Sequence, residues 1–290
     1  MSRIDDALRR TTGDRPQTYP HVEPAQEAFR PAWTGVSEEV IRVEGRGFDT
    51  IPAAGANARG LVTFSSAWRE RLATPDGDPT LVEQFRRLAG TLHQAQRTSG
   101  LRIVMLTSAN PGDGKTLTAV NLALVLADSY RARVLLIDAD LRRPSIPHVV
   151  DLGDGAGLSE ALKAPKELKL TLVPITSHLT LLPAGRPIAN SIEALTSPRM
   201  RHILEEAATR FDWVILDAPP VGPAADAHLL TELVNGTLFV IRAGQTQCPD
   251  VQNALDVLGR EHILGIVLNG VEEMPSHAYY GMPRTELESR

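Results

Sequence analysis

Short apolar runs alternate with longer amphipathic stretches along the chain from about residue 77 onward. The runs are brief and continuous, which favours strands that are buried on both faces of a parallel sheet. The amphipathic stretches predict helices that return the chain from the end of one strand to the start of the next. The predicted strands are 102–107, 133–137, 213–216, 237–241 and 265–268, and the predicted helices are 78–96, 118–126, 198–209 and 249–259. The pattern predicts an α/β fold whose mostly parallel sheet is flanked by helices.

The chain ahead of this pattern has a different character. Residues 1–76 contain scattered prolines, glycines and charges and no long periodic segment, which predicts a largely disordered N-terminal extension. Within it, residues 2–10 fit either a short docking helix or a frayed terminus, and residues 40–43 fit a short edge strand. The sequence is therefore expected to divide into a flexible region 1–76, a domain 77–272 and a flexible tail 273–290.

A glycine-rich loop follows the first predicted strand and ends in Gly-Asp-Gly-Lys-Thr at residues 112–116. Glycines let successive backbone N–H groups turn inward, and together with the start of the next helix these groups form a cradle for anions. Lys115 is placed to reach the outer phosphates of a nucleotide, and the Thr116 hydroxyl is placed to bind magnesium. The strict motif has a glycine where this chain has Ala109. The alternative is an ordinary turn beside an incidental lysine.

Acidic residues follow two later strands. Asp138 and Asp140 come directly after one predicted strand, and Asp217 comes directly after the next. In an open α/β sheet such residues reach the crevice where ligands bind. Two carboxylates close together repel each other, and a bound cation relieves that repulsion, with magnesium needing only one or two of them. The alternative is a set of turn-forming aspartates whose charge is partly offset by Arg142 and Arg143.

At these residues the chain resembles the bacterial tyrosine kinases, or BY-kinases. The Lys-Thr loop, the Asp-x-Asp-x-Arg segment and the Leu-Asp-x-Pro-Pro segment are similar to the Walker A, A′ and B motifs of that family. The resemblance covers roughly residues 78–272 and includes the connecting segments 181–185, 194–200, 226–227 and 265–270. It implies a P-loop NTPase fold and an ATP- and magnesium-dependent tyrosine autokinase that supports the synthesis and export of capsular or extracellular polysaccharide.

The resemblance also implies a role for individual residues. The nucleotide contacts would be Gly112, Asp113, Gly114, Lys115, Thr116, Leu117, Arg142 and Asn269. The magnesium ligands would be Thr116, Asp138 and Asp217, and the catalytic residues Lys115, Asp138 and Asp140. Asp138 is the candidate that accepts the proton of the tyrosine, although the sequence alone does not separate base from metal ligand between Asp138 and Asp140. For Asn269, an ordinary turn-forming Asn-Gly pair is an equal alternative.

Members of this family carry acceptor tyrosines on a flexible C-terminal tail. The tail of this chain contains Tyr279 and Tyr280, which are two of its four tyrosines and the expected phosphoacceptors. A solvated tail with two ordinary tyrosines is the alternative. The family's subunit-contact pattern, Glu-x-x-Arg-x-x-Arg, is matched at Glu83 and Arg86, but Ala89 replaces the second arginine. Glu83 and Arg86 fit either a contact in a homo-oligomer or an ordinary i,i+3 surface pair.

Composition limits the classes of function. The net charge of −5 and the pI of about 5.9 do not indicate a nucleic-acid partner. The single cysteine, Cys248, excludes an intrachain disulfide and a cysteine-rich metal site. The sequence shows neither a signal peptide nor an apolar run long enough for a membrane span, so a cytoplasmic protein is expected. The partner that the resemblance implies is a transmembrane polysaccharide co-polymerase, a chain-length adaptor that recruits the protein to the inner face of the cell membrane.

Two other functions fit a nucleotide-phosphate site. The first is a regulatory ATPase of the plasmid-partition or division-site type, a nucleotide switch that phosphorylates no tyrosine. Those ATPases carry a signature lysine five residues before the catalytic lysine, where this chain has Asn110. The second is a nucleotide-binding scaffold without catalysis, against which the presence of all three aspartates argues.

Overall fold

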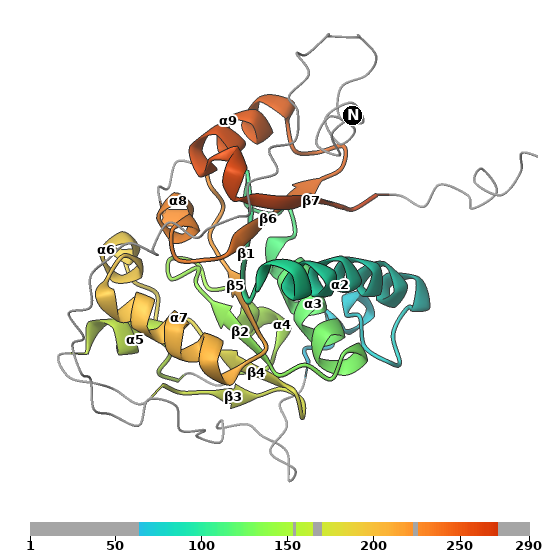
Figure 1. Ribbon diagram of the computed structural model, residues 1–290, viewed down its shortest axis with the longest axis horizontal. Coiled ribbons are helices and arrows are strands. Elements are labelled where there is room, and N and C mark those ends of the chain that lie inside the picture. Colours follow the sequence, from blue (N-terminus) through green and yellow to red (C-terminus); the bar gives the residue numbers. More distant parts are fainter. Residues whose placement is uncertain (1–63, 153–154, 165–169, 223–225, 272–290) are drawn as a thin grey trace, which may run out of the picture.

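The computed structural model describes residues 64–152, 155–164, 170–222 and 226–271 (Figure 1). Within these residues a central sheet of seven strands has the order β3-β4-β2-β5-β1-β6-β7. The strands are β1 Ile103–Ser108, β2 Val134–Asp138, β3 Val173–Pro174, β4 Leu179–Leu182, β5 Trp213–Asp217, β6 Gly236–Arg242 and β7 Ile263–Asn269. Every neighbouring pair is parallel except β3 with β4. The α/β class and the mostly parallel sheet are therefore confirmed.

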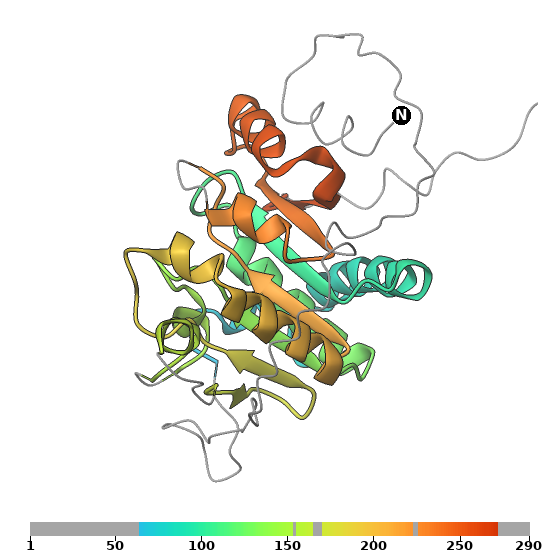
Figure 2. The same ribbon diagram turned by 60° about the vertical axis from the view of Figure 1, so that its left-hand side comes forward.

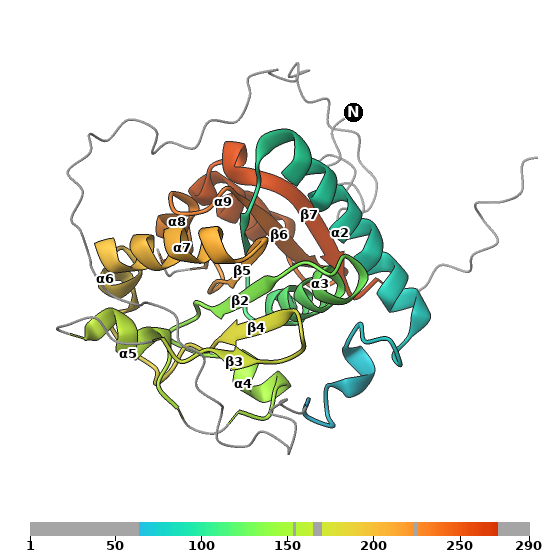
Figure 3. The same cartoon turned by 60° about the horizontal axis from the view of Figure 1, so that its bottom comes forward.

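Helices cover both faces of this sheet (Figures 2 and 3). The longer helices are α2 Pro79–Ser99, α3 Lys115–Ser129, α7 Pro198–Arg210 and α9 Cys248–Leu258. The shorter helices are η1 Arg69–Arg71, α4 Ile146–Val149, α5 Leu158–Lys163, α6 Ser191–Leu195, α8 Asp226–Thr231 and η2 Arg260–His262. Helices α2, α3 and α4 contribute to one apolar core, and the helices from α5 to α9 contribute to the other, so the sheet lies between two helical layers.

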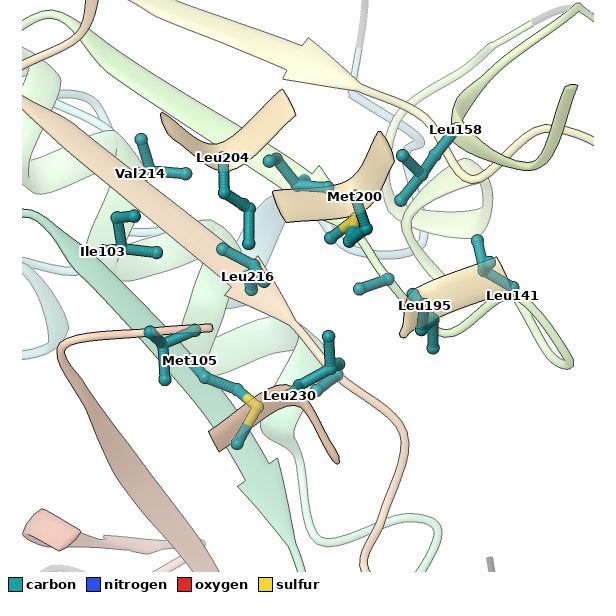
Figure 4. Close-up of a cluster of buried hydrophobic side chains, with 14 of the residues drawn as sticks. Ile103, Met105, Leu141, Leu158, Leu195, Met200, Leu204, Val214, Leu216 and Leu230 are labelled. Carbon is teal, nitrogen blue, oxygen red and sulfur yellow. The ribbon is translucent and has the colours of Figure 1, made fainter. Parts of the chain in front are cut away.

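Side chains of the central strands point alternately into these two cores. Ile103 and Met105 of β1 join Val214 and Leu216 of β5 in the core beneath α7 and α8 (Figure 4). The residues between them face α2 and α3. Because both faces of β1 and β5 are buried, these strands read as continuous apolar runs in the sequence.

All the strands and helices predicted between residues 77 and 272 are present, and each begins and ends within a few residues of its predicted limits. The sequence did not reveal β3, β4 or the four short helices α4, α5, α6 and α8. The helix predicted at 2–10, the strand predicted at 40–43 and the tail tyrosines Tyr279 and Tyr280 all lie outside the described residues, as does most of the N-terminal extension.

A segment just ahead of α2 is fastened to α3. Leu72 and Ala73 are buried, although the sequence placed them in the N-terminal region 1–76. The reason is Asn121 of α3, whose Oδ1 accepts a hydrogen bond from the Ala73 N–H at 2.8 Å and whose Nδ2 donates to the Arg71 carbonyl at 2.9 Å. Phe64 forms an isolated bridge with Val150 on the same side of the molecule.

The surface of α2 corrects one expectation. The i,i+3 pair of Glu83 with Arg86 is not formed. Glu83 Oε1 instead lies 3.4 Å from Arg87 Nε, and Arg86 Nε donates to Ser129 Oγ of α3 at 3.1 Å. Ala89, at the position of the family's second arginine, is fully buried. A longer side chain at this position would have no room against α3.

Candidate functional site

The candidate site lies where β1, β2 and β5 end at the same edge of the sheet. The phosphate loop follows β1, Asp138 is the last residue of β2, and Asp217 is the last residue of β5. Asp138 and Asp217 are register partners on adjacent parallel strands, so their backbones lie side by side. The sheet therefore brings together the three motifs that are well separated in the sequence.

Two glycines shape the phosphate loop. Gly112 has a φ of 91° and Gly114 has a φ of 96°, both in the left-handed region where a side chain is strained. Gly114 is also the N-cap of α3, and its carbonyl accepts from the N–H and the hydroxyl of Thr118, both at 2.9 Å. A Cβ at Gly114 would collide with the side-chain amide of Asn269, which donates to the Asp113 carbonyl at 2.9 Å. The loop thus enters the helix directly, which is why α3 begins at Lys115 rather than at the predicted residue 118.

Lys115 is buried among carboxylates. Its Nζ lies 3.3 Å from Asp140 Oδ2 and 3.5 Å from Asp217 Oδ1. Burial alone would lower the pKa of Lys115, but the charges of Asp217, Asp140 and Asp138 outweigh it and raise that pKa. Lys115 is therefore a fixed positive charge beside the phosphate cradle, held by the same aspartates that the sequence placed at this edge.

Asp138 lies deepest in the site. It is fully buried, and its two carboxylate oxygens accept from the backbone N–H groups of Asp140 and Ile146, each at 3.2 Å. Burial, followed by the neighbouring charge of Asp217, raises the pKa of Asp138 well above the usual value of a carboxyl group. A carboxylate of this kind holds a proton more firmly than an exposed one, which suits a group that accepts a proton during a reaction.

Asp217 fits a magnesium ligand. Among the described residues its Oδ2 is one of the few buried side-chain atoms that have no hydrogen-bond partner. Burial raises the pKa of Asp217, even though the charge of Lys115 and a hydrogen bond from Thr116 lower it. The described residues hold no group of three or more histidine, cysteine or acidic side chains placed to bind a metal. Magnesium does not require one, because it keeps several waters and takes one or two carboxylates together with phosphate oxygens.

A cavity of about 1060 Å³ runs along this edge of the sheet. Its walls include residues that the sequence predicts as parts of the site, namely Gly112, Gly114, Lys115, Thr116, Leu117, Asp140, Arg142 and Asn269. Asp138, Asp217 and Asp113 lie behind this wall. Arg142 Nε donates to Ser191 Oγ of α6 at 2.8 Å. The cavity therefore joins the phosphate loop, the acidic residues and the expected base-contacting asparagine in one space.

The far end of the cavity was not anticipated. It is lined by Trp68 of the segment ahead of α2, Leu81 and Phe85 of α2, and His148 and Val149 of α4. Trp68 lies just before η1, where Arg71 packs its guanidinium 5.6 Å from the centre of the indole ring. No motif could have disclosed this wall, since it forms only when α2, α4 and the preceding segment pack together.

No helix within the described ranges combines the length and the apolar character needed to cross a membrane.

Known proteins resemble this chain over the same residues. A family model described as ParA, NUBPL iron-transfer P-loop NTPase, matches residues 101–278. The tyrosine-protein kinase YwqD of Bacillus subtilis is 34% identical over 202 residues, which are 69% of this chain and 84% of YwqD. The succinoglycan biosynthesis transport protein ExoP of Rhizobium meliloti is 34% identical over 199 residues, which are 66% of this chain but only 25% of ExoP.

A solved structure gives the same result in three dimensions. The kinase domain of the Escherichia coli tyrosine kinase ETK superposes with a TM-score of 0.66 at 32% sequence identity, and the match covers 81% of this chain and 94% of that domain. This chain therefore belongs to the bacterial tyrosine kinase family, built on a ParA-type P-loop NTPase fold.

Proposed function

We propose that this protein is an ATP-dependent tyrosine autokinase that regulates the synthesis and export of a capsular or extracellular polysaccharide. The observation that best supports the proposal is the buried Lys115, which lies within 3.5 Å of two carboxylates at the mouth of a phosphate loop. Phosphoryl transfer depends on positioning and on neutralising charge, and this cluster is arranged for both.

The triphosphate would bind along the cavity, with its outer phosphates in the cradle of N–H groups at the start of α3. Lys115 would contact the transferred phosphate. Thr116 and Asp217, with Asp138 nearby, would hold magnesium, which supplies charge neutralisation when it is bound. The unpartnered Asp217 Oδ2 supports this assignment. Asn269, at the end of β7, would contact the base.

The hydroxyl of a tyrosine has a pKa of about 10, so it must lose its proton as transfer proceeds. We assign Asp138 as the acceptor of this proton, because its raised pKa brings it closer to that of the phenol. Asp140 lines the cavity and lies against Lys115, so we assign it to positioning the lysine and the proton path.

The acceptor tyrosine would enter from the apolar end of the cavity. Trp68, Leu81 and Phe85 provide a wall against which an aromatic ring can pack. Asn269 and Gly270 also line this cavity, and Tyr279 and Tyr280 follow them closely in the sequence. This placement supports those two residues as the phosphoacceptors.

The cellular role rests on the relatives. ExoP is named as a transport protein of succinoglycan biosynthesis, and this chain matches 25% of its length. We propose that a separate transmembrane co-polymerase supplies the membrane part and recruits this protein from the cytoplasm to the inner face of the membrane. We also propose that the protein assembles into a homo-oligomer.

The decisive experiment follows phosphotyrosine by mass spectrometry after the purified protein is incubated with ATP and magnesium. Wild-type protein is expected to gain phosphate on the tail. Lys115→Met should abolish the signal, and replacing Tyr279 and Tyr280 by Phe should reduce it. Tyr130→Phe is the matched control, because Tyr130 is a half-buried tyrosine outside the tail, and its hydroxyl makes a long 3.4 Å bond to the Arg86 carbonyl.

The same experiment identifies the alternative. ATP hydrolysis without any phosphotyrosine, even when the cytoplasmic segment of the adaptor is added, would indicate a partition-type ATPase switch. In the native cell, replacing the gene with the Lys115→Met form should change the amount or the chain length of the exported polysaccharide. An unchanged polymer would show that the kinase activity does not regulate polysaccharide synthesis or export.

A further inference from the structure

Asp113 places a carboxylate inside the phosphate loop, where a negative charge opposes the binding of an anion. The residue is only 4% exposed. Its Oδ2 accepts from the Asn110 N–H at 2.9 Å, and its Oδ1 accepts from Thr246 Oγ1 at 2.8 Å. The neighbours Gly112 and Gly114 line the cavity but Asp113 does not. Its side chain therefore points away from the phosphates, toward the loop that joins β6 to α9.

That loop and the adjoining ends of β6 and β7 hold the phosphate loop through several bonds. Thr246 is 6% exposed, and its hydroxyl accepts from the Arg242 N–H at 2.9 Å while it donates to Asp113. Arg242 Nη1 donates to the Gly112 carbonyl at 3.1 Å. Asn269 Nδ2 donates to the Asp113 carbonyl at 2.9 Å. Two consecutive carbonyl groups of the phosphate loop are thus engaged from the side of β6 and β7.

We propose that Asp113 and Thr246 form a positioning pair that keeps the phosphate loop in the conformation that binds a nucleoside triphosphate. Because donors on β6 and β7 hold the carbonyls of Gly112 and Asp113, these oxygens cannot turn into the cradle, where they would repel phosphate. The Asp113 carboxylate completes this arrangement by tying the loop to Thr246 and to its own start at Asn110. The inference rests on the proposed binding of ATP and names the residues that set its affinity.

Two simpler roles for the pair give different results. If Asp113 acted only through its charge, removing that charge would strengthen the binding of the triphosphate. If the pair only stabilised the fold, breaking it would lower the melting temperature without changing the dissociation constant for ATP measured well below that temperature. If the pair positions the phosphate loop, ATP should bind more weakly both when the charge of Asp113 is removed and when the bond between Asp113 and Thr246 is broken.

The first test is Thr246→Val, which keeps the shape of the side chain and removes the hydroxyl. The substitution removes both the bond to Asp113 and the bond from the Arg242 N–H. Isothermal titration calorimetry with magnesium and ATP should then show a dissociation constant raised at least roughly tenfold, which corresponds to the net free energy of about one hydrogen bond. Thr246→Ser should restore the affinity of the wild-type protein. Thr237→Val is the matched control, because Thr237 is a buried threonine of β6 whose Oγ1 has no partner among the described residues. Its ATP affinity should not change.

The second test is Asp113→Asn, which also serves if Thr246→Val fails to fold. An amide has only one acceptor oxygen, so either the Asn110 N–H or the Thr246 hydroxyl loses its acceptor, and ATP should bind more weakly. Tighter binding would overturn the proposal in favour of a charge effect. Unchanged affinity in Thr246→Val or in Asp113→Asn would overturn it in favour of a purely structural role.

Failure of this inference is distinct from failure of the proposed function. If the wild-type protein shows no heat on titration with magnesium and ATP, the nucleotide site itself is wrong. If the wild-type protein binds and all variants bind equally well, the site stands and only the positioning pair is refuted.

Discussion

At the residue scale, the site is organised by one buried cation among three buried carboxylates. Lys115 pairs with Asp140 and Asp217, whereas Asp138 is satisfied by backbone N–H groups. Three acidic groups facing one lysine leave an excess of negative charge in a place that is largely shielded from water. A bound divalent cation would balance that excess, and the protein without one carries the cost of its own repulsion.

A first prediction concerns Asp217→Asn in magnesium-free buffer. Burial raises the pKa of Asp217 in the folded protein. Such a group contributes stability that is complete below its unfolded pKa of about 3.9 and is lost as the pH rises through the folded value. Asparagine does not titrate, so only the wild-type protein loses this stability as the pH rises. The melting temperature of the variant minus that of the wild-type protein should therefore increase between pH 4.5 and pH 7.5. Thermal unfolding in EDTA measures it, and a difference that shrinks with pH would contradict the assignment.

A second prediction separates the two aspartates of the A′ segment. If Asp138 accepts the proton, Asp138→Asn should slow tyrosine phosphorylation roughly 100- to 10,000-fold. Its affinity for ADP measured without magnesium should stay unchanged, because Asp138 does not line the cavity. Asp140→Asn should weaken nucleotide binding, since Lys115 loses a partner. Rapid-quench kinetics give the rates, and a larger rate loss in Asp140→Asn would transfer the proton-accepting role to Asp140.

At the scale of elements, the sequence predicted best what is long and periodic. The buried strands β1, β2 and β5 are continuous apolar runs, so their positions and their acidic ends could be read directly. The short strands β3 and β4 and the four short helices are held by tertiary contacts rather than by a local pattern. The same applies to the site, where the motifs named the residues, but the Asp113–Thr246 bond joins positions far apart in the chain. Such a bond leaves no signature in either segment.

The start of α2 allows a prediction about one element alone. Asp78 is the N-cap of this helix, and its Oδ1 accepts from the Thr80 N–H at 2.8 Å. Asp78→Ala should lower the free energy of unfolding by about 1 kcal/mol. Asp76→Ala, two residues earlier and exposed, is the control and should change it by less than about 0.5 kcal/mol. Urea denaturation measures both, and equal losses in the two variants would show that the cap contributes nothing.

At the scale of the whole molecule, the cavity is assembled from segments far apart in the sequence. Its walls come from Trp68 near the N-terminal end of the described chain, from the phosphate loop, and from Asn269 at the end of β7. A ligand that fills this cavity contacts elements from both ends of the described chain. Its binding should therefore stabilise the fold as one unit.

This leads to a prediction for the complete protein. At a concentration about 100 times the dissociation constant, magnesium and ATP should add about 2.7 kcal/mol to the free energy of unfolding. For a chain of this size the melting temperature should rise by roughly 5–10 °C. Differential scanning fluorimetry measures the rise. Magnesium alone should produce only part of it, and a full rise with magnesium alone would show that the nucleotide adds nothing.

The bonds of Asn121 have a mechanical consequence. The helix that begins at the phosphate cradle carries, on its second turn, an amide that is bonded to the backbone at Arg71 and Ala73. A movement of this helix along its axis would therefore also move the backbone at Arg71 and Ala73. The stretch lies near the N-terminal end of the described residues. A force that displaces Arg71 and Ala73 would act on the helix that carries Lys115. The segment ahead of α2 and the phosphate loop therefore cannot move independently of each other.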